Sequence, residues 1–157
     1  AACAGHAIQA RVCAEKSDGT WQPSTGEILQ YSEPPLVRID SGVAAGQTIS
    51  GKYDNMIAKV IVHAPDRDAA IDQLHTALQH YVINGIHTNI PLLRQLLNDP
   101  VFREVRHYTR YLQKEFVPPQ NNPALAAAIA AIALYQGELK QNQERFGVLA
   151  GFTNTAR

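Results

Sequence analysis

Apolar and polar residues alternate with a period of two at the beginning of the chain. The apolar series is Ile8, Ala10, Val12 and Ala14. The polar series is Gln9, Arg11, Cys13 and Glu15. Successive side chains of a strand point to opposite faces, so this pattern predicts a half-buried strand over residues 6–14. Arg11 is then expected on the polar face of that strand.

Several further strands are predicted before residue 64. Short candidates occupy residues 27–31, 36–40 and 47–50, separated by prolines and glycines, and their close spacing favours antiparallel hairpins. Residues 56–63 form a nearly continuous apolar run that is rich in β-branched side chains. Such a run is typical of a central strand.

After Pro65 the apolar period changes from two to 3.6, which predicts a helix. Asp66 is a suitable N-cap, and Asn84-Gly85 is a suitable end. The apolar face comprises Ile71, Leu74, Leu78 and Tyr81.

A second helix is predicted after Asn89, which is an N-cap candidate, with Pro91 in the first turn and the end near Asn98. A short helix is expected near residues 109–116.

Prolines and polar turn formers are concentrated in residues 117–123 and predict a domain boundary. We therefore expect one domain over residues 1–116, and a linker helix with the start of a following domain over residues 117–157. The linker helix would extend from Pro123 to Phe146. The predicted fold class is α+β: an antiparallel sheet or open barrel, followed by packed helices and a C-terminal helical linker.

Composition narrows the functional classes. The 157 residues are 45% hydrophobic, and 14 basic residues balance 14 acidic ones, so the positive charge expected of a nucleic-acid binder is missing. No strongly apolar stretch reaches the about 18 residues needed to span a membrane. With only two cysteines, a disulfide framework is not expected, and we predict a cytoplasmic protein. The functional classes that remain are an enzyme and a protein-binding module. The missing initiator Met suggests that the chain is a piece of a larger protein.

Generic catalytic motifs are missing from the sequence. The six histidines include no His-x-x-x-His pair, and neither a phosphate-binding loop nor a Cys-x-x-Cys motif occurs, so no metal site is predicted. Arg11 is the best candidate for chemistry, because it lies on the polar face of the first strand. From the pattern alone, it could equally be a surface residue paired with Glu15 or Glu27.

The residues around Arg11 are similar to a known family motif. The stretch Gly5-His-Ala-Ile-Gln-Ala-Arg11-Val-Cys-Ala-Glu15 resembles the Gly-His-Ala-x-Glu-x-Arg-x-x-Ala-Glu motif of the C-terminal subdomain of biotin carboxylases. Further similar segments follow in the family's order, through the closing Tyr111-Leu-Gln-Lys. They are Pro23-Ser-Thr-Gly26, Val37-Arg-Ile-Asp-Ser-Gly42, Tyr53-Asp-Asn-Met-Ile-Ala-Lys59, Asp66-Arg67 and Gly85-Ile-His-Thr-Asn89.

The resemblance implies the C-terminal lobe of an enzyme that uses ATP, Mg2+ and bicarbonate to carboxylate biotin. It implies that Arg11 contacts the biotin ureido group as a catalytic residue. A guanidinium would stabilise the negative charge that develops there. Thr109 and Arg110 would lie on the adenine side of the ATP site, and Arg38 at a subunit interface or in a surface ion pair. Asp54 and Lys59 match the family pattern, with structural roles expected.

The sequence also departs from the family. Gln9 replaces the usual Glu, Cys13 replaces Asn or Tyr, and Pro34-Pro35-Leu36 is a shorter turn than usual, which puts the familiar dimer contact in doubt.

Two features bear on the branch of the family. The ATP-grasp core and a biotinyl Ala-Met-Lys-Met sequence are not found in the chain. The Ala-rich segment after Pro123 resembles the linker of acyl-CoA carboxylase α subunits of the methylcrotonyl, propionyl or geranyl type. Expected partners are an upstream ATP-grasp core, a biotinylated carrier domain and a carboxyltransferase β subunit, with a homo-oligomer possible. The alternatives are a urea carboxylase fragment or a non-catalytic interaction module.

Overall fold

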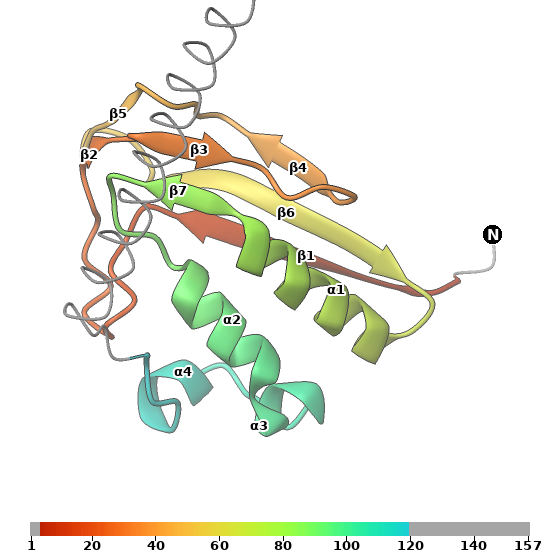
Figure 1. The fold of residues 1–157 in the computed structure, drawn as a ribbon. Coiled ribbons are helices and arrows are strands. Elements are labelled where there is room, and N and C mark those ends of the chain that lie inside the picture. The colour runs from red at the N-terminus through yellow and green to blue at the C-terminus, as the bar shows by residue number, and fades with distance from the viewer. Residues whose placement is uncertain (1–3, 120–157) are drawn as a thin grey trace, which may run out of the picture. The chain divides into compact units, whose positions relative to one another are not determined.

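The computed structural model describes residues 4–119, which form seven strands and four helices (Figure 1). The strands are β1 (His6–Cys13), β2 (Gly26–Glu27), β3 (Gln30–Ser32), β4 (Arg38–Ser41), β5 (Thr48–Ile49), β6 (Met56–Ala64) and β7 (Val82–Asn84). The helices are α1 (Arg67–His80), α2 (Ile90–Asn98), α3 (Pro100–Arg103) and α4 (Tyr111–Lys114).

The main sheet has three antiparallel strands in the order β1-β6-β4. The central position of β6 confirms the prediction for residues 56–63. The alternation in β1 is confirmed as well, because Ala10 and Val12 are buried while Gln9 and Arg11 are exposed. The α+β class with antiparallel sheets is therefore correct.

The prediction of hairpins between neighbouring strands is wrong. Within the described residues, β2 pairs with β5, β3 with β7, and β4 with β6, all antiparallel. The strands between residues 26 and 49 are two to four residues long. Isolated pairs of strands this short are only marginally stable, so closeness along the chain does not decide their partners. β3 and β4 pair with the later strands β7 and β6, and β2 pairs with β5, beyond β3 and β4 in the sequence.

Helix α1 begins where the sequence predicts. The Asp66 side chain accepts a hydrogen bond from the Ala69 N–H at 2.9 Å and caps the helix. The helix ends at His80 rather than at Asn84, because residues 82–84 form β7 against β3. Tyr81 marks the change: its buried ring packs edge-on against Tyr31, and the two hydroxyl groups are 2.7 Å apart.

Helix α1 packs across β1 and β6 and supplies much of the core. Its fully buried side chains include Ile71, Leu74 and Leu78, which confirms the predicted apolar face; Tyr81, just past the helix end, is buried too. A second, smaller cluster joins α2 to α4 through Leu92, Tyr111 and Phe116.

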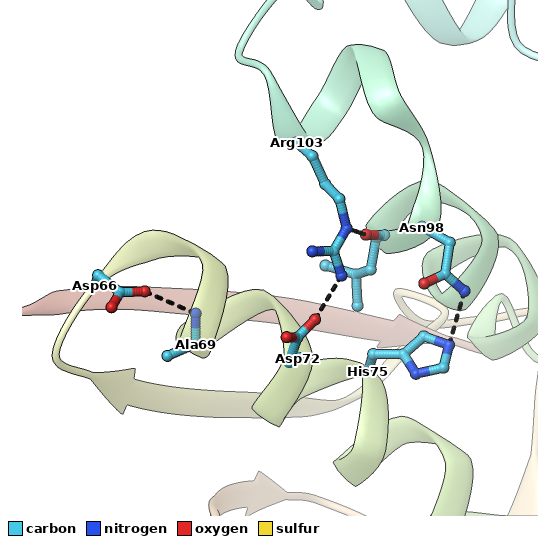
Figure 2. A network of polar contacts seen from close by, with 7 residues as sticks. Asp66, Ala69, Asp72, His75, Asn98 and Arg103 are labelled. Carbon is cyan, nitrogen blue, oxygen red and sulfur yellow. Dashed lines mark hydrogen bonds and ion pairs between the residues drawn. The ribbon is translucent and has the colours of Figure 1, made fainter.

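Polar contacts hold α1 against the next two helices (Figure 2). Arg103, at the end of α3, forms an ion pair with Asp72 of α1 and donates to the Leu97 carbonyl of α2. His75 of α1 lies 3.0 Å from the Asn98 amide nitrogen. The helices following the sheet therefore form one packed group.

The remaining predictions have mixed outcomes. The short helix expected near residues 109–116 is α4, whereas α3 was not predicted; Asp99 caps α3 by accepting from the N–H groups of Val101 and Phe102. The linker helix predicted from Pro123 to Phe146 lies outside the described residues. Within residues 4–119, no helix is long and apolar enough to cross a membrane.

Candidate functional site

The main sheet has a polar face opposite its core face. Arg11 of β1 lies directly opposite Lys59 of β6, and Lys59 lies opposite Asp40 of β4. Residues paired in this way project to the same face of a sheet. Gln9 and Arg38 occupy the neighbouring row of the same face, on either side of Ile61. On the other face of the sheet, Val12 of β1 and Val60 of β6 are fully buried.

Arg11 brings an exposed guanidinium to this face. The ion pairs among the described residues are Arg38–Asp40, Arg103–Asp72 and Arg106–Glu104. The alternative pairing of Arg11 with Glu15 or Glu27 is therefore not formed there; Glu15 accepts from the Asn55 amide instead. Two cations in register, Arg11 and Lys59, repel each other. This arrangement favours an anion, or a group that develops negative charge, at the polar face.

Arg38 has a partner on its own strand. Its Nε and Nη2 donate to the two carboxylate oxygens of Asp40 at 3.0 and 3.1 Å. The hydrogen bond from Arg38, with its positive charge and that of Lys59, lowers the pKa of the Asp40 carboxyl. Both side chains are exposed, at 71% for Arg38 and 44% for Asp40. The ion pair expected as one alternative is thus present, and the interface role remains a prediction.

The main chain at Arg11 is held by Asn89, which sequence reasoning assigned to a different task. Asn89 occupies the N-cap position of α2, but its side chain makes no capping hydrogen bond. Its Oδ1 accepts from the Cys13 N–H at 2.9 Å, and its Nδ2 donates to the Arg11 carbonyl at 3.1 Å. The Asn89 N–H also donates to the Cys13 carbonyl at 3.1 Å. Asn89 is only 6% exposed.

The capping prediction for Asn89 was wrong for a physical reason. An Asn before a helix ordinarily bonds the free N–H groups of the first turn. Here those bonds compete with unpaired polar groups at the end of a strand more than 70 residues earlier. The sequence signal available was a Thr-Asn pair after a glycine turn, which does not reveal a partner so distant along the chain.

Cys13 shares these surroundings. Burial raises the pKa of its thiol, and the negative charges of Glu15 and Asp54 raise it further, while Arg11 acts in the opposite direction. Asp54 also accepts from the Met56 N–H at 3.4 Å, in keeping with the turn-forming role expected for it. Cys13 is therefore a protonated, weakly reactive thiol near neutral pH.

Thr109 and Arg110 lie in another part of the fold. Both are exposed and directly precede α4, whose Tyr111 packs in the second cluster with Leu92. Arg110 is at the N-cap position of α4 without a side-chain capping bond. Among residues 4–119, no hydrogen bond or ion pair joins either of them to Arg11. Their role on the adenine side of an ATP site remains a prediction.

The described residues contain no group of three or more His, Cys, Asp or Glu side chains that could hold a metal ion. Residues 4–119 thus offer a cationic face and an arginine whose main-chain carbonyl is held by Asn89, but no cluster suited to Mg2+.

Comparison with known proteins shows what this arrangement is similar to. Residues 9–114 match the family described as the biotin carboxylase C-terminal domain. A biotin carboxylase from Allochromatium vinosum is 40% identical over 112 residues, covering 70% of this chain and 25% of that protein. The mitochondrial propionyl-CoA carboxylase alpha chain of Caenorhabditis briggsae is 35% identical over 168 aligned positions, covering 96% of this chain and 23% of that protein.

A solved structure has the same fold. The biotin carboxylase domain of Hydrogenobacter thermophilus 2-oxoglutarate carboxylase, in complex with MgADP, ADP and bicarbonate, aligns with a TM-score of 0.69 and 37% identity. The alignment covers 71% of this chain and 25% of that chain. The chain thus spans about a quarter of the length of these relatives. The motif around Arg11, the fold and the match over residues 9–114 lead to one assignment: the chain belongs to the biotin carboxylase C-terminal domain family.

Proposed function

We propose that this chain is the C-terminal lobe of a biotin carboxylase and that Arg11 acts on the biotin ureido group. The observation that supports this most directly is an exposed guanidinium, in register with a second cation and without an ion-pair partner among the described residues. Arg38, on the same face of the sheet, instead has its guanidinium bonded to the carboxylate of Asp40.

The chemistry suits a guanidinium. A ureido nitrogen is a weak nucleophile until negative charge can build on the neighbouring oxygen. Arg11 is always protonated near neutral pH and offers several N–H donors in a fixed plane. Donors fixed before the reaction stabilise developing charge without reorganising. Lys59, opposite Arg11 in β6, adds positive potential at the same face.

Other parts of the reaction would depend on residues outside this lobe. The described residues include no metal-binding cluster, so ligands for Mg2+ and most contacts to ATP would come from an ATP-grasp core. Thr109 and Arg110 are proposed to contribute at the adenine side. Both are exposed and so accessible to another domain.

Within the family, we favour the α subunit of an acyl-CoA carboxylase. The propionyl-CoA carboxylase alpha chains of two Caenorhabditis species and a Dictyostelium methylcrotonoyl-CoA carboxylase alpha subunit align over 90% or more of this chain. The Allochromatium biotin carboxylase and the mouse propionyl-CoA carboxylase alpha chain align over 70% and 69%. The additional coverage includes the segment predicted as a linker helix. The proposed partners are accordingly a biotinylated carrier domain and a carboxyltransferase β subunit.

The role of Arg11 is tested by Arg11→Ala in the complete carboxylase that contains this chain. Removing one preorganised donor should reduce biotin carboxylation by about 10²-fold or more. The thermal midpoint should be unchanged, because the side chain is on the exposed face. Activity is measured as biotin-dependent ADP release, and stability by differential scanning calorimetry.

Arg106→Ala is the matched control, since Arg106 is an exposed arginine paired only with Glu104. It should retain full activity. Retained activity in Arg11→Ala, together with a lower thermal midpoint, would show that Arg11 is a structural residue and would contradict the proposal.

A further inference from the structure

We infer that Asn89 is a positioning residue for Arg11: its side-chain amide fixes the main chain that carries the guanidinium. This inference rests on the proposed function of Arg11. Asn89 itself has no access to a substrate from its buried position, so any effect on chemistry would pass through Arg11.

The contacts hold the main chain on the C-terminal side of Arg11, around Val12. The amide of Asn89 donates to the Arg11 carbonyl and accepts from the Cys13 N–H, which is the next donor on the same side of the strand. The Asn89 main-chain N–H then donates to the Cys13 carbonyl. Three hydrogen bonds from one residue therefore replace a neighbouring strand at this point.

The end of β1 needs this support for two reasons. β1 is an edge strand: one of its edges pairs with β6, and the other has no strand beside it in the main sheet formed by the described residues. The pairing with β6 also becomes irregular at this point, because Val12 lies opposite Ala58 but Cys13 lies opposite Met56, which leaves Ile57 without a partner residue in β1. The extra residue is in β6, and it disrupts the ladder of hydrogen bonds between β6 and the end of β1. Without Asn89, the peptide groups on both sides of Val12 would lose partners on their free edge.

Only an amide side chain meets this requirement at this length. One bond needs a donor and the other needs an acceptor, and Asn supplies both from one planar group. Aspartate has the same shape but two acceptors, so it would place an oxygen against the Arg11 carbonyl oxygen. Alanine would leave both the Arg11 carbonyl and the Cys13 N–H without their partner.

The chain provides a matched control for loop attachment. Ser17, which is 3% exposed, donates from its hydroxyl to the Thr88 carbonyl at 2.8 Å. This bond joins the same two segments as Asn89 does, but it does not involve the peptide groups of Arg11 or Cys13. Ser17→Ala therefore weakens the attachment of the segment without releasing the end of β1.

The experiment compares Asn89→Ala, Asn89→Asp, Ser17→Ala and Arg11→Ala in the complete carboxylase. Two rates are measured: the biotin-dependent release of ADP, and the slower bicarbonate-dependent ATP hydrolysis without biotin. A small misplacement of a catalytic group can reduce a rate by about 10²-fold. We expect both Asn89 variants to lower kcat/KM for biotin by about tenfold to 10²-fold. Hydrolysis without biotin should remain within about twofold of wild type, the scatter expected for an untouched step.

Each outcome decides between clear alternatives. Because Asn89→Asp is isosteric, it keeps the test available if the alanine variant does not fold. Ser17→Ala should lose stability but keep its kcat/KM for biotin. Loss of biotin turnover in Arg11→Ala but not in the Asn89 variants would overturn the inference and leave the proposed function intact. Equal losses in Asn89→Ala and Ser17→Ala would also overturn it, since Asn89 would then only attach the loop.

A double variant adds an independent criterion. If Asn89 acts through Arg11, Arg11→Ala with Asn89→Ala should be no slower than Arg11→Ala alone. If the double variant were slowed by the product of the two single-variant losses, Asn89 would act independently of Arg11. Biotin turnover that survives Arg11→Ala would instead contradict the proposed function itself.

Discussion

The reactivity of the Cys13 thiol depends on the charges around Arg11 and can be measured without an activity assay. Burial and the charges of Glu15 and Asp54 raise the pKa of its thiol, whereas Arg11 lowers it. Thiolate, rather than thiol, reacts with alkylating reagents. The rate of alkylation at Cys13 therefore measures the local balance of charge.

We predict that Glu15→Gln will make Cys13 react faster with iodoacetamide at pH 8, because removing a negative charge lowers the pKa of the thiol. Arg11→Ala should have the opposite effect. Site-resolved mass spectrometry separates Cys13 from Cys3. Equal rates in wild type and both variants would show that these charges do not reach the thiol.

Gly85 is constrained both by its dihedral angles and by its neighbours. Its φ is +105°, and a Cβ atom there would collide with the Glu27 carbonyl oxygen and the Leu29 main-chain nitrogen. We predict that Gly85→Ala will lower the free energy of unfolding by about 1–3 kcal/mol or more. Urea titration followed by circular dichroism measures the change.

Two other glycines separate the causes of that effect. Gly46 has a φ of +83° but nothing within 4 Å of an added Cβ, so Gly46→Ala should lose only the conformational part. Gly42 has neither constraint, so Gly42→Ala should be nearly neutral. Equal stability of all three variants would contradict the interpretation that Gly85 packs too closely against β2 to accept a Cβ atom.

At the residue scale, the sequence predicts which face of an element a side chain is on better than it predicts which residues that side chain contacts. The exposure of Arg11 follows from strict alternation over its own strand, a local property. The roles of Asn89 and Gly85 depend on segments that are more than 50 residues away along the chain. Local propensity assigned Asn89 to a cap and Gly85 to the end of a helix, because the actual partners are decided by the tertiary fold.

The short elements after α2 are held by one carboxylate. Asp99 caps α3 with one oxygen and accepts a hydrogen bond at 2.7 Å from the Tyr111 hydroxyl with the other. This hydrogen bond is the main reason that the pKa of Tyr111 is raised to about 12. The neutral phenol is thus favoured in the folded state.

The raised pKa gives a pH dependence with a definite sign. Stability from the Tyr111 hydroxyl is fully present below the ordinary tyrosine pKa of about 10 and is lost as pH rises towards about 12. We predict that Tyr111→Phe will be less stable than wild type at pH 8 and will lose less stability between pH 8 and 11. Urea titrations at several pH values measure both. Tyr53→Phe, which changes a ring that is 85% exposed, should follow the wild-type curve.

At the element scale, the sequence predicts helices better than strand pairing. The start and the buried face of α1 follow from a capping residue and a 3.6-residue period, both within the segment. Its end does not, because Val82 and Ile83 fit a helical pattern as well as a strand until β3 is available to pair with them. For the shortest strands, the local sequence does not indicate which strand each will pair with.

At the scale of the whole molecule, this lobe is expected to need the rest of an enzyme. We predict that the purified 157-residue chain will release no phosphate from ATP in the presence of bicarbonate, because residues 4–119 contain no metal-binding cluster. A phosphate-release assay measures this, with a complete biotin carboxylase as the positive control. Phosphate release that depends on bicarbonate and stays proportional to the amount of chain through successive purification steps would contradict the prediction.

The antiparallel partnership of β1 with β6 has a consequence for how the chain acquires its fold. About 40 residues separate the end of β1 from the start of β6, and α1 follows later still. Pairing of such distant segments is intrinsically slow, because the entropy cost of closing a long loop comes before any stabilising contact forms. During synthesis at about 5–20 residues per second, β1 would wait some seconds for its partner. The strand carrying Arg11 is therefore made before its partner strand but ordered only afterwards, and Asn89, which is made later again, completes its attachment.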